Sequence, residues 1–112
     1  MTSEETLAAH SQELRRGTVV LAALASLAEP RYGYALLEHL GQSGIEVEGN
    51  TLYPLLRRLE KQGLLTSEWN TDESRPRKFY ALTDEGRNVL TALTGEWDAL
   101  HTALQRLTRG RP

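Results

Sequence analysis

The sequence predicts a mostly α-helical protein with one small β-hairpin, on three observations. Residues 51–65 carry leucines at the spacing of a buried helical stripe, which is closed by a glycine. Residues 64–69 and 78–82 alternate partly between apolar and polar side chains and enclose a stretch rich in turn-forming residues. Residues 83–109 repeat apolar side chains at helical spacing. A helix followed at once by a hairpin indicates a winged helix-turn-helix, here with a further helix toward each end of the chain.

The N-terminal segment predicts an arm helix followed by a core helix. Thr2 and the acidic residues after it form a capped helix start, and this helix should extend to Leu14. Gly17 is expected to interrupt the pattern before a mostly apolar helix begins at Val19. Pro30 closes that helix, because the residue before a proline disfavours helical geometry.

The next predicted helix opens at residues 32–34, Tyr-Gly-Tyr, and ends among residues 41–44, which contain two glycines. Its inward face is expected to carry Leu36, Leu37 and Leu40. Together with the helix that follows after a short connection, it forms the predicted helix-turn-helix.

Residues 51–65 form the predicted recognition helix, which has one apolar and one polar face. The apolar stripe consists of Leu52, Leu55, Leu56 and Leu59. At about 100° per residue, the opposite face carries Asn50, Tyr53, Arg57 and Lys61. Docking of the apolar face on the protein would leave the polar face free to touch phosphates and base edges of DNA.

The hairpin also carries cations, which changes how the helix cations are interpreted. On an isolated helix, Arg57 and Lys61 are most simply a solvated polar face. The hairpin, however, adds Arg75, Arg77 and Lys78. A wing with these charges can hold phosphates while the helix enters the major groove. Two acidic residues at the expected tip oppose close phosphate approach: Asp72 and Glu73.

The final helix carries an unbroken apolar stripe. Its members are Leu90, Leu93, Trp97, Leu100, Leu104 and Leu107. A helix of about 25 residues is about 38 Å long, which is more than a small winged core can cover. We expect a second copy of the chain to cover the stripe; the alternative is that the helix folds back on its own domain or arm.

The two tryptophans receive different interpretations. Trp97 lies at the centre of the stripe, where it is either a large core residue or one wall of a flat apolar ligand cavity between two subunits. Trp69 ends a predicted strand and is expected to pack against the protein.

Composition and net charge do not identify a binding partner. The 112 residues, 39% of them hydrophobic, fit one globular domain. The 13 basic and 15 acidic residues give a net charge of −2, so a nucleic-acid partner has to be argued from the local distribution of charge.

Residue types that are absent or isolated in the sequence argue against secreted, membrane, metal-binding and catalytic proteins. The chain has no cysteine, no apolar run long enough to span a bilayer and no basic start typical of a signal peptide, so we expect a cytoplasmic protein. Its histidines are isolated and its glycines single, so no metal site and no cofactor are expected. Because no nucleophile and base cluster in the sequence, we do not expect an enzyme.

Four segments, taken in order, resemble the PadR family of bacterial transcriptional regulators in its short form. They are residues 14–18 before an apolar helix, residues 32–34, residues 50–60 with the sequence NTLYPLLRRLE, and residues 75–86 with the sequence RPRKFYALTDEG. Each motif alone is modest, whereas the ordered set is specific and spans nearly the whole chain.

The resemblance implies a homodimer whose two winged units bind a roughly palindromic operator and usually repress a nearby gene. The positions that match the family's DNA surface are Tyr34, Asn50, Thr51, Tyr53 and Arg57, with Arg77 and Lys78 on the wing. Family members commonly respond to phenolic acids or hydrophobic drugs, and some place a tryptophan like Trp97 beside a central dimer pore. Ala81 departs from the pattern, because the family often has a basic residue there.

We therefore expect residues 1–82 to form a winged helix-turn-helix DNA-binding region with an arm helix, and residues 83–112 to form a dimerisation helix, together one continuous structural domain. The expected function is repression by a dimer on a palindromic operator, with release by a hydrophobic or phenolic molecule at the dimer interface. The rival is a winged helix used only as a protein-interaction module, which the acidic net charge favours.

Overall fold

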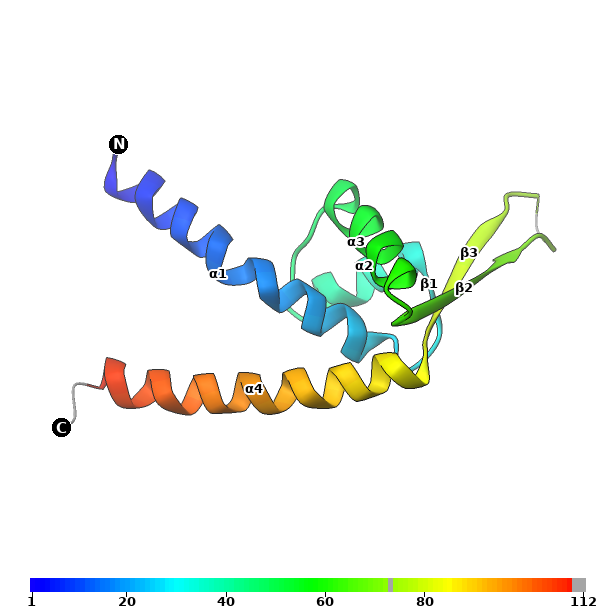
Figure 1. The fold of residues 1–112 in the computed structure, drawn as a ribbon. Helices are drawn as coiled ribbons and strands as arrows, with labels where there is room; N and C mark the ends of the chain where they lie inside the picture. Colours follow the sequence, from blue (N-terminus) through cyan, green and yellow to red (C-terminus); the bar gives the residue numbers. More distant parts are fainter. Residues whose placement is uncertain (73, 110–112) are drawn as a thin grey trace.

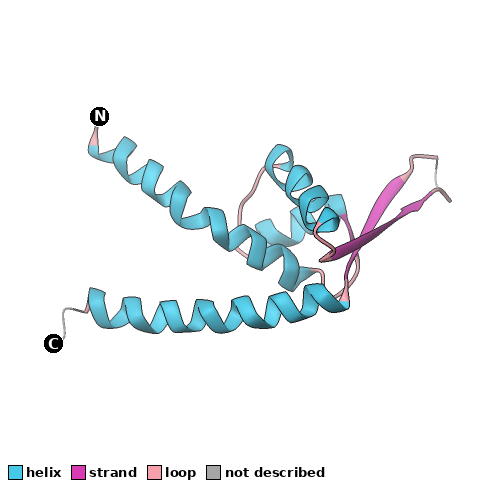
Figure 2. Ribbon diagram, viewed as in Figure 1, coloured by secondary structure: helices cyan, strands magenta, loops and turns pink. Residues whose placement is uncertain are grey.

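The part of the chain that the structure describes consists of four helices and a three-stranded antiparallel sheet (Figures 1 and 2). The structure is a computed structural model and describes residues 1–72 and 74–109. The elements in chain order are α1 (Ser3–Ser26), β1 (Arg31–Tyr32), α2 (Gly33–Gln42), α3 (Gly49–Lys61), β2 (Leu65–Asn70), β3 (Arg77–Leu82) and α4 (Asp84–Thr108). The predicted fold class is confirmed.

Two long helices extend from a winged body. The body is formed by α2, α3 and the sheet, and the β2–β3 hairpin, which we call the wing, projects from it (Figure 1). The N-terminal half of α1 and the C-terminal half of α4 extend toward the opposite side, so the molecule measures 59 × 35 × 23 Å. None of the described helices combines the length and the apolar content that a membrane span requires.

The first helix is continuous, and the prediction that Gly17 separates an arm from a core helix is wrong. α1 runs through Gly17 without a break and begins at Thr2, whose side chain accepts a hydrogen bond from the Glu5 amide at 3.1 Å. A lone glycine costs a helix interior only about 1 kcal/mol relative to alanine, which the backbone hydrogen bonds on either side can offset. The arm and the buried segment therefore form one continuous helix.

The sheet contains a strand that the sequence did not predict. β1 pairs antiparallel with β3, with Arg31 opposite Tyr80 and Tyr32 opposite Phe79. Two residues are too few to show apolar alternation, so only the tertiary pairing reveals the strand. The predicted hairpin is confirmed, since β2 and β3 pair in register from Leu65 opposite Leu82 to the far end.

The core forms where α1, α2 and α3 meet the sheet. The four leucines of the α3 stripe are all buried, as predicted, and the largest fully buried side chains are Leu24, Leu27, Leu36, Leu40, Leu52 and Leu56. On α2, Leu37 is only half-buried and packs at the edge of this core. Burial of a leucine contributes roughly 1.5–3 kcal/mol, so the stripe holds α3 firmly on the body.

A tight junction connects the end of α3 to the start of α4. Gly63 ends the turn after α3 with a φ of +79°, a conformation that side chains rarely adopt. The Thr83 hydroxyl donates to the Gly63 carbonyl at 2.6 Å and accepts from the Gly86 amide at 3.0 Å. Gly86 is buried so closely against the Leu64 carbonyl that a Cβ there would collide with it. This junction fixes the direction in which α4 leaves the body.

We predict that Gly86→Ala destabilises the protein by at least about 1–3 kcal/mol, because the new methyl group has to displace backbone. Gly95→Ala is the matched control on the same helix, since a Cβ at Gly95 meets nothing within 4 Å. That change should stabilise the protein by about 0.5–1 kcal/mol through helix propensity. Urea denaturation measures both, and equal stability of the two variants would contradict the close contact at Gly86.

Candidate nucleic-acid interface

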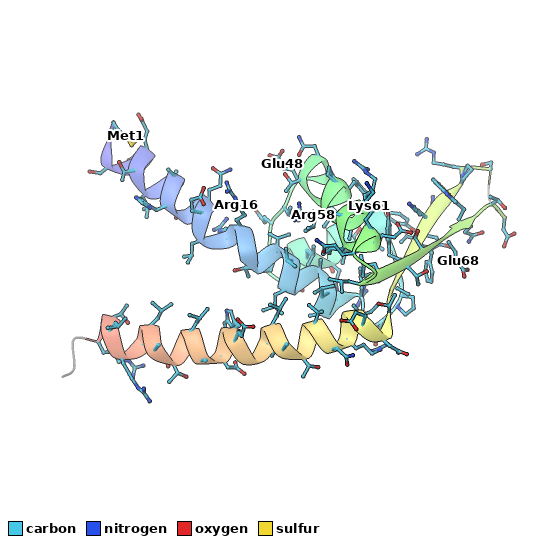
Figure 3. All side chains as sticks on the ribbon, viewed as in Figure 1. Met1, Arg16, Glu48, Arg58, Lys61 and Glu68 are labelled. Carbon is cyan, nitrogen blue, oxygen red and sulfur yellow. The ribbon has the colours of Figure 1, made fainter. Side chains whose placement is uncertain are left out.

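The face of α3 opposite its leucines is polar and open to solvent. Asn50 and Thr51 are exposed at its N-terminal end, and Arg57 and Lys61 are exposed farther along. Arg58 is exposed as well, and Figure 3 labels Arg58 and Lys61 on α3. Burial of the leucines therefore leaves a polar helix face that a partner can reach.

Tyr53 departs from the prediction that it points outward. Its side chain is half-buried and packs at the edge of the core. A Cβ on Gly33 would lie 2.8 Å from the Tyr53 ring and one on Gly49 would lie 3.2 Å from it, so the two glycines make room for the ring. The close approach of α2 and α3 thus holds Tyr53 between the helices rather than on the outer face.

The wing cation Arg77 is held by an aromatic side chain at the start of α2. Its Nη1 donates to the Tyr34 hydroxyl at 3.0 Å, and its guanidinium lies 4.8 Å from the centre of the Tyr34 ring. Tyr34 in turn stacks on Tyr32, with ring centres 5.8 Å apart. The two predicted DNA contacts therefore belong to one preorganised unit, whose stacking limits the motion of the guanidinium.

The wing cation Lys78 is also held by interactions within the protein. Its Nζ lies 3.4 Å from a carboxylate oxygen of Glu60 on α3, and Ser67 donates to the other oxygen at 2.6 Å. The same ammonium group lies 5.6 Å from the centre of the Tyr80 ring and 5.9 Å from that of Trp69. Lys78 therefore ties the wing to α3, and Glu60 offsets much of its charge. The sequence analysis did not single out Glu60, because its partner lies on a distant strand.

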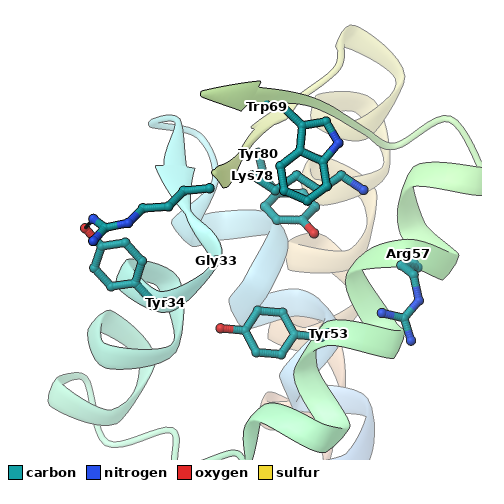
Figure 4. Close-up of a pocket in the computed structure, with 8 residues that line it drawn as sticks. Gly33, Tyr34, Tyr53, Arg57, Trp69, Lys78 and Tyr80 are labelled. Carbon is teal, nitrogen blue, oxygen red and sulfur yellow. Dashed lines mark hydrogen bonds between the residues drawn. The ribbon is translucent and has the colours of Figure 1, made fainter. Parts of the chain in front are cut away.

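A hollow of about 450 Å³ lies between the start of α2, the polar side of α3 and the wing (Figure 4). Its aromatic lining consists of Tyr34, Tyr53, Trp69 and Tyr80. Its cationic lining consists of Arg57, Arg77 and Lys78. Trp69 is 64% exposed, so the prediction that it packs against the protein is wrong. Aromatic walls beside three cations suit an anionic partner better than a neutral one.

The tip of the wing adds both signs of charge. Arg75 and Asp72 are exposed there, and the Asp72 amide donates to the Asn70 side chain at 3.0 Å. Glu73, the second predicted acidic residue, lies outside the described residues. Ala81 is half-buried on β3 opposite Thr66, well back from the tip. Among the described residues, no group of three or more potential ligands is placed to hold a metal ion.

The family model described as the transcriptional regulator PadR-like family matches residues 20–92, which includes α2, α3 and the wing. The chain belongs to the PadR-like family of transcriptional regulators. The assignment predicted from the ordered motifs is thus confirmed. A transcriptional regulator from Mycobacterium tuberculosis is 40% identical to this chain over 81 residues, which cover 71% of the chain and 76% of that relative.

Solved structures show the same PadR architecture. A PadR family transcriptional regulator from Eggerthella lenta has 48% sequence identity and a TM-score of 0.89, with 94% of each chain covered. A PadR-like regulator from Bacillus cereus has 27% identity and a TM-score of 0.79 over 88% of this chain and 99% of its own. The likeness includes the long terminal helices, because these coverages exceed the winged body.

The long α4 of this PadR-like chain leaves an apolar face in water. Val89, Leu90 and Leu93 pack partly on the core, whereas the rest of the predicted stripe lies beyond it. The large exposed side chains of this outer part are Trp97, Leu100, Leu104 and Leu107. Trp97 is 47% exposed and stacks on His101, with ring centres 5.1 Å apart and an angle of 3° between the rings. The sequence analysis missed His101, although its spacing from Trp97 places both on one side of the helix.

Proposed function

We propose that this PadR-like protein is a homodimeric repressor that binds a palindromic operator through α3 and the wing and is released by a small hydrophobic or phenolic molecule. The observation that carries the proposal is the exposed polar face of α3 beside the cations of the wing. The family supports transcriptional regulation. Such a role fits a cytoplasmic protein without catalytic chemistry.

Contacts to bases and contacts to phosphates come from different parts of this surface. Asn50, Thr51 and Arg57 stand on the exposed side of α3, where they would reach base edges in the major groove. The wing cations Arg75 and Arg77 would contact phosphates of the flanking DNA backbone. Because Glu60 compensates Lys78 at 3.4 Å, we assign Lys78 a smaller share of phosphate binding than Arg75.

Dimerisation would place two such surfaces on one DNA. The outer stripe of α4 exposes several large apolar side chains that a lone chain has no means to bury. On α1, Leu7 and Leu14 are exposed as well, so the arm can add to the same interface. A twofold pair would present two α3 helices, and binding of a palindrome requires them about 34 Å apart or a multiple of that distance.

Release by an effector follows if the effector prefers a different helix separation. A ligand shifts such an equilibrium only through unequal affinity for the two states. The stacked rings of Trp97 and His101 offer a flat, partly exposed surface on the proposed interface. A planar apolar molecule could stack there and alter the angle between the two α4 helices.

The second candidate function is a protein-interaction module without sequence-specific DNA binding. The net charge of −2 and the compensated Lys78 are the observations in its favour. Random duplex at low salt separates the two candidates, because a DNA reader keeps some nonspecific affinity through phosphate contacts.

We predict that Arg57→Ala lowers operator affinity by at least about tenfold, the loss expected for one base or phosphate contact. Arg106→Ala is the matched control, because it removes the same charge near the far end of α4. Fluorescence anisotropy with labelled operator measures both, and circular dichroism checks the fold. Equal affinities of the two variants would remove Arg57 from the DNA surface.

We predict that Leu100→Glu combined with Leu104→Glu produces monomers, since both side chains are exposed in a single chain and the charges would be buried in the dimer. The control is Ala99→Glu combined with Thr102→Glu, which adds the same charge on the other side of α4. Analytical ultracentrifugation measures the mass. A double variant that keeps the mass of a dimer would exclude this stripe as the interface.

We predict that phenolic acids and planar hydrophobic dyes quench the fluorescence of Trp97 and weaken operator binding. Trp69 also fluoresces, so Trp69→Phe serves as the background in which Trp97 alone reports. Trp97→Ala should abolish the effect of the molecule on DNA binding. An equal response in that variant would exclude Trp97 from the effector site.

A further inference from the structure

A hydroxyl group without a protein hydrogen-bond partner opens into the hollow beside the start of α2. Tyr80 on β3 is only 4% exposed, and its hydroxyl points into the hollow between Tyr53 and Arg57 (Figure 4). No described residue forms a hydrogen bond with this hydroxyl, whereas nearby Tyr32 uses its own to accept from Asn70. None of the buried polar side-chain atoms in the described residues lacks a partner, so this hydroxyl is reached by solvent from the hollow and is available for a ligand.

The Tyr80 hydroxyl group is suited to act as a hydrogen-bond donor. Burial raises the pKa of Tyr80, and the nearby charge of Glu60 raises it further, while Arg57 opposes the shift. The side chain therefore stays protonated at physiological pH and can donate to an anion. Glu60 itself does not repel an anion strongly, because its carboxylate is bound by Lys78 and Ser67.

The N-terminus of α2 opens into the same hollow. Gly33 and Tyr34, its first two residues, line the hollow, and Tyr32 at the N-cap provides no side-chain hydrogen bond. The first amide groups of a helix have no partner within the helix and carry partial positive charge, which favours an anion. The space beside Gly33 where a Cβ would lie is occupied by the Tyr53 ring, which fixes that ring as one wall of the hollow.

We infer that this hollow receives one phosphodiester group of the DNA backbone, with the Tyr80 hydroxyl as a donor to a phosphate oxygen, Arg57 beside it and the N-terminus of α2 behind it. The inference rests on the proposed function. The hollow lies between α2, α3 and the wing, the elements proposed to lie along DNA, so a backbone phosphate can enter while the duplex stays intact. Tyr80 lies within the motif of residues 75–86, but the sequence analysis assigned it no contact with DNA.

The test removes this one hydroxyl. Tyr80→Phe should lower the affinity for operator and for random duplex alike by about tenfold, because a hydrogen bond to a charged group is lost and a phosphate carries no sequence information. Thr91→Val is the control, because it removes a hydroxyl group on α4 that is bound to the Arg87 carbonyl and lies outside the hollow, and it should change affinity less than about twofold. Thermal unfolding of Tyr80→Phe should match that of the wild type.

A second measurement distinguishes direct contact between Tyr80 and a phosphate from an indirect effect of the mutation on the shape of the protein. Operators with a neutral methylphosphonate at one backbone position at a time are titrated with wild type and with Tyr80→Phe. At one position per half-site, the methylphosphonate should weaken binding by Tyr80→Phe clearly less than binding by wild type, which is the non-additivity of groups in contact. Losses that add at every position would overturn the inference, even if Tyr80→Phe binds weakly.

The two proposals fail in different ways. If wild type binds operator and Arg57→Ala does not, unaltered binding by Tyr80→Phe overturns the phosphate site alone. If wild type binds neither operator nor random duplex at low salt, the proposed function and the phosphate site are both excluded.

Discussion

The structure depends on the docking of α3 through its leucine stripe. Leu52, Leu55, Leu56 and Leu59 are all buried, and each contributes roughly 1.5–3 kcal/mol. The direction of the polar face is therefore held by far more free energy than a surface ion pair supplies, which is about 1 kcal/mol or less. Because the leucines are buried, Asn50 and Arg57 have to face solvent. The same docking brings Tyr53 against Gly33 and so forms one wall of the hollow.

The candidate interface has a few cations at defined positions rather than a high net positive charge. The chain is slightly acidic overall, yet cations line the hollow and the wing. Two of them are restrained, Arg77 by the Tyr34 hydroxyl and Lys78 by Glu60. Restraint lowers the entropy lost when a ligand orders the side chains, at the cost of some net charge. A surface of this kind favours a partner of matching shape over indiscriminate attraction to any polyanion.

In the proposed dimer, the long helices would set the spacing of two such surfaces. The contacts of Thr83 and Gly86 with the turn after α3 link the direction of α4 to the end of the recognition helix. A change in the packing angle of two α4 helices would therefore move the two α3 helices relative to each other. The stacked pair of Trp97 and His101 lies on the outer part of α4, where a small rotation at the proposed interface would produce a large displacement of the attached body.

The sequence by itself determined the elements whose signals are local. Leucines at helical spacing specified which face of α3 is buried, alternation specified β2 and β3, and the ordered motifs specified the PadR-like family. The same local reasoning failed at Gly17, because a single weak helix former does not outweigh the hydrogen bonds on both sides.

Only the tertiary structure decided what depends on partners distant in sequence. It paired β1 with β3, drew Tyr53 between two glycines, left Trp69 exposed and joined Lys78 to Glu60. It also made Tyr80 part of the lining of the hollow, with a hydroxyl group that forms no hydrogen bond to a described residue. Alternation along β3 shows only that the ring is buried. Periodicity reports which side of an element meets the core, whereas the partner of each polar atom is set by how separate elements come together.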